Sequence, residues 1–213
     1  FINAGWDMQS TWAAFVGTAP HLQVESYAGT YQYVWQGDTS TDWSAGANWV
    51  GGSAPTGDSD TAYVISGLTY DPTTSEAVEI AELNVASGTL TLDHAMTLGG
   101  DLNLSGGAIV QNEALTVGGD YAQTGGTFTG DHTKTFTVDG SFSIPDTAGA
   151  FDRYEGAGTS GDPYLIRDVY DLQAMKDYLS SSFMLSEDID ASGTATWSGG
   201  VGFDPVGENY WRT

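Results

Sequence analysis

Three similar hexapeptides decide the fold: residues 97–102 read TLGGDL, residues 116–121 read TVGGDY and residues 137–142 read TVDGSF. Successive hexapeptides start 19 and 21 residues apart. A second glycine marker recurs between them in steps of 18 and 19, at Ser87-Gly88-Thr89, Ser105-Gly106-Gly107 and Thr124-Gly125-Gly126. Two markers with one period indicate an internal repeat of about 20 residues. Glycines at these points are expected where φ is positive or where two backbones approach closely.

Short runs of alternating apolar and polar residues separate the markers, as in strands with one buried face. They lie at residues 83–85, 89–92, 102–104, 127–129, 136–138 and 142–144. Because a unit this short cannot bury its apolar face alone, successive units must stack. The sequence therefore predicts an all-β parallel β-helix with two interior columns, Leu98, Val117 and Val138, and Leu102, Tyr121 and Phe142. A Gly-rich β-sandwich is the alternative, but a sandwich requires no sequence repeat of constant length.

Composition limits the kinds of partner. The 213 residues include 28 acidic and 5 basic side chains, for a net charge of −23, and no Cys. Such a polyanion repels phosphate backbones and anionic lipid, so neither nucleic acid binding nor membrane insertion is predicted. No apolar run approaches the roughly 20 residues of a membrane helix. The chain begins at Phe1 without Met or a signal sequence, which predicts a mature product or a fragment of a longer protein.

Residues 33–65 form a Trp- and Gly-rich segment containing Trp35, Trp43 and Trp49. Its spacing resembles an opening segment common in large secreted bacterial proteins, ahead of β-helical repeats like those of autotransporters and haemagglutinins. The resemblance implies export to the cell surface. The three indoles either form a platform that stacks on sugar rings or close a small core at the end of the solenoid, and the core interpretation is favoured.

The last sixty residues contain the predicted helix. Pro163–Ile166 is expected to be a strand, and Val169, Leu172, Met175 and Leu179 share one helical face. Asp168 occupies the expected N-cap, Asp171 follows three residues later as in a capping box, and Lys176 lies toward the C-terminal turn. One short α-helix is predicted near residues 168–180, with a strand starting at Phe183–Leu185.

Residues 162–207 resemble the start of a GLUG-type repeat module, a family found in bacterial adhesins. The similarity lies in DPYLI, FMLSEDID and GFDPVG. The resemblance implies that the helix covers the open end of a β-helix, where bare strand edges would otherwise recruit other chains. Near the N-terminus, Gly5-Trp6-Asp7, Trp12-Ala13 and Pro20-His21-Leu22 resemble the close of such a module.

Four regions are therefore predicted. Residues 1–26 are closing strands of a GLUG-like module, and residues 27–75 are the Trp- and Gly-rich β segment. Residues 76–147 are β-helix coils of about 19 residues. Residues 148–213 hold the capping helix and the start of a second GLUG-like module.

No catalytic, cofactor-binding or metal-ligating residue is assigned, and the chain is not predicted to be an enzyme. A β-helix does not by itself exclude catalysis, but no nucleophile elbow, Walker loop or helical His pair is present. Asp93-His94, Asn112-Glu113 and Asp131-His132 are expected at one turn of successive coils, as a polar surface rather than a metal ladder. Calcium is favoured over a transition metal, because Asp58 and Asp60, or Glu187, Asp188 and Asp190, offer hard oxygen ligands.

The sequence predicts an extracellular bacterial β-solenoid with a structural or adhesive role, as a segment of a larger surface protein or a subunit of a filament. Its expected partners are other copies or tandem neighbours, joined through the solenoid ends, and surface glycans. In the filament hypothesis, Phe1–Leu22 of one copy completes the solenoid begun at Phe183–Thr213 of the next. The alternative is a carbohydrate-binding or carbohydrate-degrading β-helix.

Overall fold

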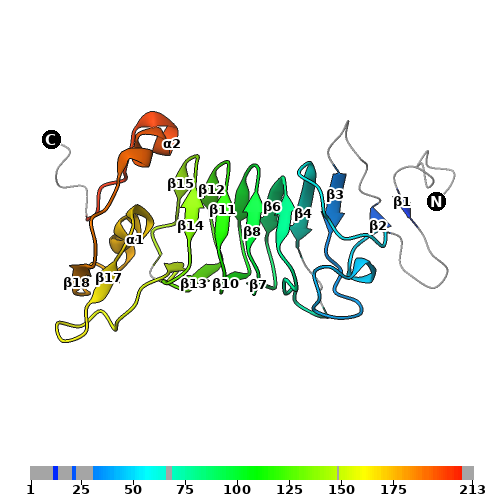
Figure 1. Cartoon of the computed structure of the whole chain (residues 1–213), viewed down its shortest axis with the longest axis horizontal. Helices are drawn as coiled ribbons and strands as arrows, with labels where there is room; N and C mark the ends of the chain where they lie inside the picture. Colours follow the sequence, from blue (N-terminus) through cyan, green and yellow to red (C-terminus); the bar gives the residue numbers. More distant parts are fainter. Residues whose placement is uncertain (1–11, 14–20, 23–30, 66–68, 148, 208–213) are drawn as a thin grey trace.

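The computed structural model describes residues 12–13, 21–22, 31–65, 69–147 and 149–207. Its central part is a parallel β-helix whose coils stack along the long axis of the molecule (Figure 1). Three short strands form each complete coil, and each strand pairs in parallel with its equivalents in the adjoining coils. The predicted parallel β-helix is confirmed.

Three sheets form the faces of the solenoid. The first contains β5 (Val78–Ile80), β8 (Met96–Leu98), β11 (Leu115–Val117) and β14 (Phe136–Val138). The second contains β7 (Thr89–Leu92), β10 (Ala108–Gln111), β13 (Thr127–Gly130) and β16 (Phe151–Asp152). The third and longest contains β3 (Tyr31–Val34), β4 (Asp60–Val64), β6 (Glu82–Val85), β9 (Leu102–Leu104), β12 (Tyr121–Gln123) and β15 (Phe142–Ser143).

The remaining elements lie outside these faces. Two short strands, β1 (Trp12–Ala13) and β2 (His21–Leu22), pair antiparallel. Two more, β17 (Tyr164–Ile166) and β18 (Phe183–Leu185), pair in parallel. The helices are α1 (Val169–Ala174) and α2 (Trp197–Gly200), with 3-10 turns at Gly46–Asn48, Met175–Asp177 and Ser192–Thr196.

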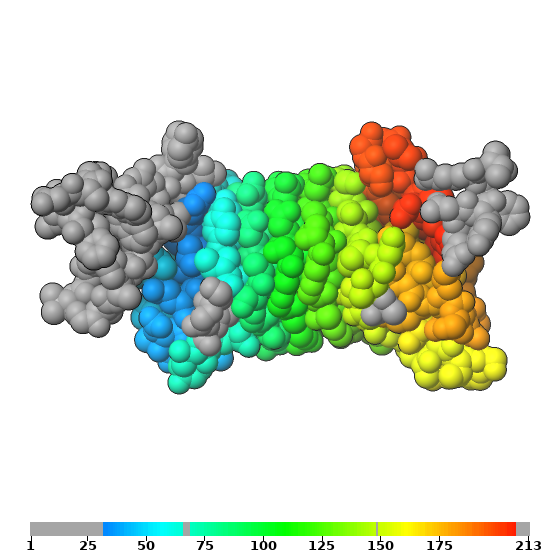
Figure 2. Space-filling model, turned by 180° about the vertical axis from the view of Figure 1, so that it is seen from behind, coloured from blue at the N-terminus to red at the C-terminus, as the bar shows by residue number. Residues whose placement is uncertain are grey.

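Strand register confirms both interior columns. Leu98 pairs with Val117 and Val117 with Val138, while Leu102 pairs with Tyr121 and Tyr121 with Phe142. All six side chains are buried. Because inward and outward positions alternate, one apolar face of every strand enters a continuous core. The coils appear as successive bands of colour across the middle of the space-filling view (Figure 2).

The glycines of the two markers meet two physical requirements, a positive φ and close stacking of coils. Gly88, Gly107 and Gly126 have φ values of 70°, 69° and 69°, a region that only glycine adopts readily. Close stacking of the coils also requires glycine. A Cβ on Gly118 of the second hexapeptide would lie 2.8 Å from the carbonyl oxygen of Gly99, and a Cβ on Gly107 would lie 2.5 Å from the carbonyl oxygen of Gly88. Gly118 is therefore required by the distance between coils, whereas Gly107 and Gly126 are required by both the dihedral angle and that distance.

The aspartates of the hexapeptides add bonds between coils that the sequence reading did not anticipate. The Asp120 backbone N–H donates to Asp101 Oδ1 at 2.8 Å, and the Ser141 N–H donates to Asp120 Oδ1 at 2.7 Å. Each carboxylate thus satisfies a backbone donor at the same corner of the next coil. The repeat of Asp in TLGGDL and TVGGDY follows from this ladder.

The capping helix lies where it was predicted, but it is shorter. It covers six residues followed by a 3-10 turn, rather than residues 168–180. Its buried positions include Val169, Tyr170 and Ala174, whereas Leu179 is 57% exposed. Of the predicted face, Val169 is buried and Leu172 and Met175 are half-buried, so only Leu179 was placed wrongly. The 3-10 turn breaks the α-helical spacing before Leu179 is reached. The regions predicted at 1–26 and the contact through Phe1–Leu22 fall mostly outside the described residues.

Candidate functional site

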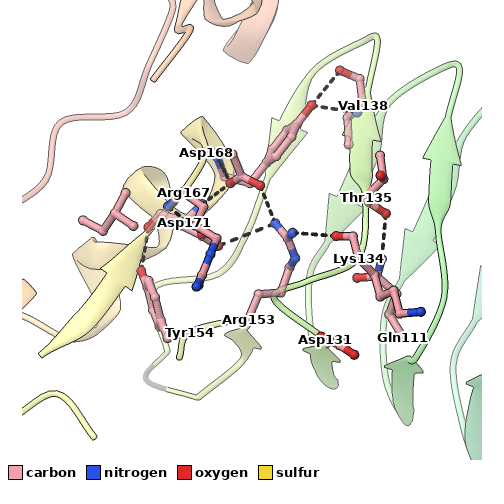
Figure 3. A network of polar contacts seen from close by, with 12 residues as sticks. Gln111, Asp131, Lys134, Thr135, Val138, Arg153, Tyr154, Arg167, Asp168 and Asp171 are labelled. Carbon is pink, nitrogen blue, oxygen red and sulfur yellow. Dashed lines mark hydrogen bonds and ion pairs between the residues drawn. The ribbon is translucent and has the colours of Figure 1, made fainter. Parts of the chain in front are cut away.

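The C-terminal end of the β-helix is closed by α1 through a network of polar contacts (Figure 3). Asp168 is the N-cap, and its Oδ1 accepts from the backbone N–H groups of Tyr170 at 3.0 Å and Asp171 at 2.9 Å. Asp171 Oδ2 accepts from the Arg167 N–H at 3.1 Å. The predicted N-cap is confirmed, and the capping-box carboxylate reaches one residue further back than in the usual motif.

Arg153 joins this cap to the last coils of the solenoid. Its guanidinium is buried and lies 5.1 Å from the centre of the Phe136 ring. Nη1 donates to Asp168 Oδ2 at 2.8 Å and lies 3.5 Å from Asp171 Oδ1, while Nη2 donates to the Lys134 carbonyl at 3.4 Å. A buried arginine held between two carboxylates costs much more to remove than an exposed ion pair.

Asp171 is a buried carboxylate with an unusual protonation equilibrium. Burial, and then the negative charge of Asp168, raise the pKa of Asp171 to about 7, although Arg153 opposes the shift. Its Oδ1 accepts no hydrogen bond. Tyr154 donates its hydroxyl to the Asp171 carbonyl at 2.6 Å, and burial together with the Asp171 charge raises the pKa of Tyr154. The cap therefore contains a group that titrates near neutral pH.

Aromatic side chains seal the end of the apolar column. The Tyr170 ring packs edge-on against Phe136 and Phe142, with centroids 4.9 Å and 5.0 Å away. Its hydroxyl accepts from the Val138 N–H at 2.7 Å and donates to the Val138 carbonyl at 3.1 Å. Trp197 of α2 stacks on Tyr170, with the ring centroids 5.8 Å apart. The tyrosine thus covers the column and satisfies an edge-strand donor and acceptor together.

Lys176 and Gln173 attach the C-terminal segments to this end. Lys176 Nζ donates to the Ile144 carbonyl at 3.1 Å and lies 2.7 Å from Asp146 Oδ1. Gln173 exchanges two hydrogen bonds with the backbone of Asp204, both 2.9 Å long. Sequence reasoning placed Lys176 in the last helical turn, but nothing in the pattern indicated these long-range partners.

The three tryptophans of the N-terminal segment form a buried cluster. Trp35, Trp43 and Trp49 are 1%, 2% and 1% exposed. Trp43 stacks on Trp35 at 6.3 Å, and Trp49 meets Trp43 edge-on at 4.6 Å. Asn48, also buried, accepts three hydrogen bonds from Thr39 and Ser40 and so fixes the surrounding loop. The core interpretation is confirmed, and a three-indole sugar platform is excluded because the rings are not accessible.

The polar turn ladder occurs at the predicted positions but is occupied by internal contacts. Asn112 Nδ2 donates to Asp93 Oδ1 at 2.7 Å, and Asp131 Oδ1 accepts from Thr133 within its own turn. The neighbouring His132 lies 3.5 Å from Glu155. These side chains serve the turns and the stacking of coils, in agreement with the polar-surface interpretation.

One carboxylate of each acidic cluster considered for calcium accepts hydrogen bonds from its own loop. Asp60 is buried, and its Oδ2 accepts from the N–H groups of Thr56 and Gly57, both at 2.9 Å. Asp190 Oδ1 accepts from the Ser192 N–H at 2.9 Å. Among the residues that the structure describes, no group of three or more His, Asp or Glu is placed to hold a metal ion. Calcium binding stays a prediction.

Fold and site together define the chain as a capped parallel β-solenoid. A 58-residue stretch is 45% identical to Halomucin from Haloquadratum walsbyi (strain DSM 16790 / HBSQ001). The aligned stretch covers 25% of this chain and 1% of Halomucin, so the chain spans a very small part of that relative. No protein-family profile matches the chain, and no solved structure matches it. The resemblances to GLUG-type modules and to autotransporter or haemagglutinin repeats therefore stay predictions.

Proposed function

We propose that the chain is a structural β-solenoid segment of a larger extracellular surface protein, without catalytic activity. The observation that supports this most is the uninterrupted parallel ladder of the six-stranded sheet, from β3 to β15. In such a stack every coil is bonded to its neighbours, so the segment acts as a stiff spacer rather than as a hinge. The partial similarity to Halomucin is compatible with a structural role at a surface.

The charge and the closed end favour the same role. A net charge of −23 keeps the surface solvated and repels other polyanions. The polar groups of Arg153, Asp168 and Tyr170 bond to one another's segments and close the end of the solenoid. Residue types that are catalytic in many enzymes therefore have a structural use here. Within the described residues, none of the helices is long and apolar enough to cross a membrane.

The first experiment tests location and stiffness together. Antibodies against the purified chain should label intact cells of the source organism as strongly as permeabilised cells, and small-angle scattering should give the profile of a rod. An antibody against a cytoplasmic protein controls for leakage. Labelling that requires permeabilisation would contradict the surface location, and a scattering profile of a flexible chain would contradict the spacer role.

Contact with copies or tandem neighbours through the solenoid ends is the finer part of the proposal. At the C-terminal end, Leu179, Met184 and Leu185 are exposed, and β18 pairs only with β17 among the described strands. Open strand edges with apolar neighbours favour addition of a further strand. Light scattering on a sizing column should show association that increases with concentration and decreases in Met184→Lys. A monomer at every concentration would contradict a filament of identical copies.

A further inference from the structure

Three Asp-Pro peptide bonds occur in the sequence, at Asp71-Pro72, Asp162-Pro163 and Asp204-Pro205. An aspartate carboxylate can close a five-membered ring on the main-chain carbonyl carbon of its own residue, as a nucleophile held next to its target. The proline nitrogen belongs to a tertiary amide and leaves as a basic secondary amine. All three aspartates are exposed, so any difference between the three bonds must come from the surrounding backbone.

The carbonyl oxygen of Asp162 is held by two backbone donors. The Ala157 N–H donates to it at 3.1 Å, and the Thr159 N–H donates to it at 3.0 Å. The Asp162 N–H donates back to the Thr159 carbonyl at 3.2 Å, so the two residues form an antiparallel bridge across a tight turn. Two N–H groups directed at one carbonyl oxygen stabilise the negative charge that this oxygen acquires when a nucleophile adds to the carbon.

The other two Asp-Pro bonds lack this pair of donors. The Asp204 carbonyl accepts from the side chain of Gln173 at 2.9 Å, and the Asp204 carboxylate lies 3.4 Å from Lys176 Nζ. Within the part of the chain that the structure describes, no donor is bonded to the Asp71 carbonyl. The fold therefore singles out the Asp162-Pro163 bond.

Glycine holds the two donors close to this bond. Gly156 has a φ of 98°, and a Cβ at this position would lie 2.2 Å from the Pro163 carbonyl oxygen and 3.4 Å from Asp162 Oδ1. A larger residue would push the donor segment away. The Gly158 carbonyl accepts from the Ser182 N–H at 2.8 Å, which ties the loop to the segment before β18. The loop itself projects from the body of the molecule, as the yellow atoms in Figure 2 show, so water reaches it.

We propose that the chain cleaves itself at the Asp162-Pro163 bond in mild acid. The Asp162 carboxylate forms a C–O bond to its own main-chain carbonyl carbon, and the N–H groups of Ala157 and Thr159 stabilise the oxyanion. The C–N bond then breaks as the Pro163 nitrogen takes a proton from the solvent and leaves as an amine. Asp162 is left as a cyclic anhydride. One water molecule opens the anhydride to the side-chain carboxyl and a new C-terminal carboxyl.

The cut would separate the solenoid from the polypeptide that caps it. Contacts across the cut would keep the two fragments together, among them the ion pair of Arg153 with Asp168 and the hydrogen bonds between Tyr170 and Val138. A covalent junction would thus become a non-covalent one. Each chain reacts once and acts on no other molecule, so the inference goes beyond the structural role proposed above without depending on it.

Mass spectrometry of the purified chain tests the proposal. The chain is incubated at about pH 7 and at about pH 4, near the pKa of an exposed aspartate, with circular dichroism to verify that it stays folded, and is denatured before the measurement. We expect fragments 1–162 and 163–213, with masses that sum to the intact chain plus one water, and faster cleavage at the lower pH. In the folded chain this bond should break about tenfold or more faster than the other two Asp-Pro bonds. In concentrated urea the three rates should converge.

Substitution of the nucleophile supplies the second readout. Asp162→Glu keeps the charge on an exposed side chain but requires a six-membered ring, so it should lose most of the cleavage at this bond. Asp71→Glu, also exposed, is the matched control and should leave that cleavage unchanged. The proposal is overturned if the bond stays intact at about pH 4, if it breaks no faster than the other two bonds or equally fast in urea, or if Asp162→Glu is cut at the parental rate, as a contaminating protease would do.

Discussion

Asp171 makes the C-terminal cap sensitive to pH, and Asp171→Asn tests this. The carboxyl lies between Arg153 of the last coil, Asp168 of the N-cap and the backbone of Arg167, with Tyr154 against its main chain. Asparagine keeps the oxygen that accepts from the Arg167 N–H and keeps nearly the same shape. It removes only the ionisation, so the variant isolates the effect of charge at this position.

The direction of the effect follows from the pKa of Asp171. It rises from 3.8, the ordinary value of an aspartate in the unfolded chain, to about 7 in the folded protein. Folding therefore favours the protonated form. The stability associated with it is complete at low pH and is lost as pH rises from about 4 to 7. The difference between the two pKa values corresponds to a loss of at most about 4 kcal/mol in the free energy of unfolding. Relaxation of the protein around the buried charge makes the actual loss smaller. The asparagine variant lacks this loss, so its advantage over the parent should grow between pH 5 and pH 8.

Hydrogen exchange at the first turn of α1 is a suitable assay. The Leu172 N–H donates to the Asp168 carbonyl at 3.1 Å, so its protection reports local opening of the cap. After correction for intrinsic exchange rates, protection in the variant relative to the parent should rise as pH increases. Asp188→Asn, at an exposed loop position, controls for the loss of one negative charge. A ratio that is constant from pH 5 to pH 8, or that falls, would refute the assignment of the titration to Asp171.

Three further outcomes are expected. In thermal unfolding, Gly118→Ala should lower the free energy of unfolding by about 1–3 kcal/mol, because its Cβ would press on the preceding coil. Gly161 has open space around it, so Gly161→Ala should change that free energy little. Equal effects of the two substitutions would contradict the stacking argument. In urea titrations, Arg153→Met should lower the free energy of unfolding by about 3–5 kcal/mol, because Asp168 and Asp171 lose their cationic partner in the cap. An unchanged free energy of unfolding would contradict the proposed network. Raising NaCl from about 0.1 M to about 1 M shortens the screening length from about 10 Å to about 3 Å. Because the chain carries a net charge of −23, weaker self-repulsion should raise its melting temperature. A fall in the melting temperature would show that self-repulsion does not limit its stability.

The repeat could be read from the sequence because every coil imposes the same local demands. An inward residue such as Leu102 or Tyr121 must be apolar, and the corner before it must leave room for the backbone of the preceding coil. These demands recur at each level, so they appear as a period. The N-cap at Asp168 was predictable for a similar reason, since it involves contacts within three residues.

The details of the cap could not be read in this way. Arg153 meets Asp168 and Asp171 only after the chain turns through β17, and Tyr170 bonds to Val138, 32 residues earlier. No local spacing encodes such contacts. Leu179 was placed wrongly because the 3.6-residue period does not continue through the 3-10 turn. A groove lined by Trp43, Pro55 and Val78 requires two segments that lie more than 20 residues apart in the sequence.

By itself, the sequence determined the solenoid, its coil length and its interior columns, because a repeating fold writes the same short-range constraints into every coil. Only the tertiary structure decided how the solenoid ends: which aromatic ring covers the column, which carboxylates surround Arg153 and which indole keeps an unpaired N–H. The ends have no neighbouring coil to repeat, so they are held by contacts between distant residues. The TLGGDL, TVGGDY and TVDGSF corners belong to the first kind of information, and the Asp171 cap belongs to the second.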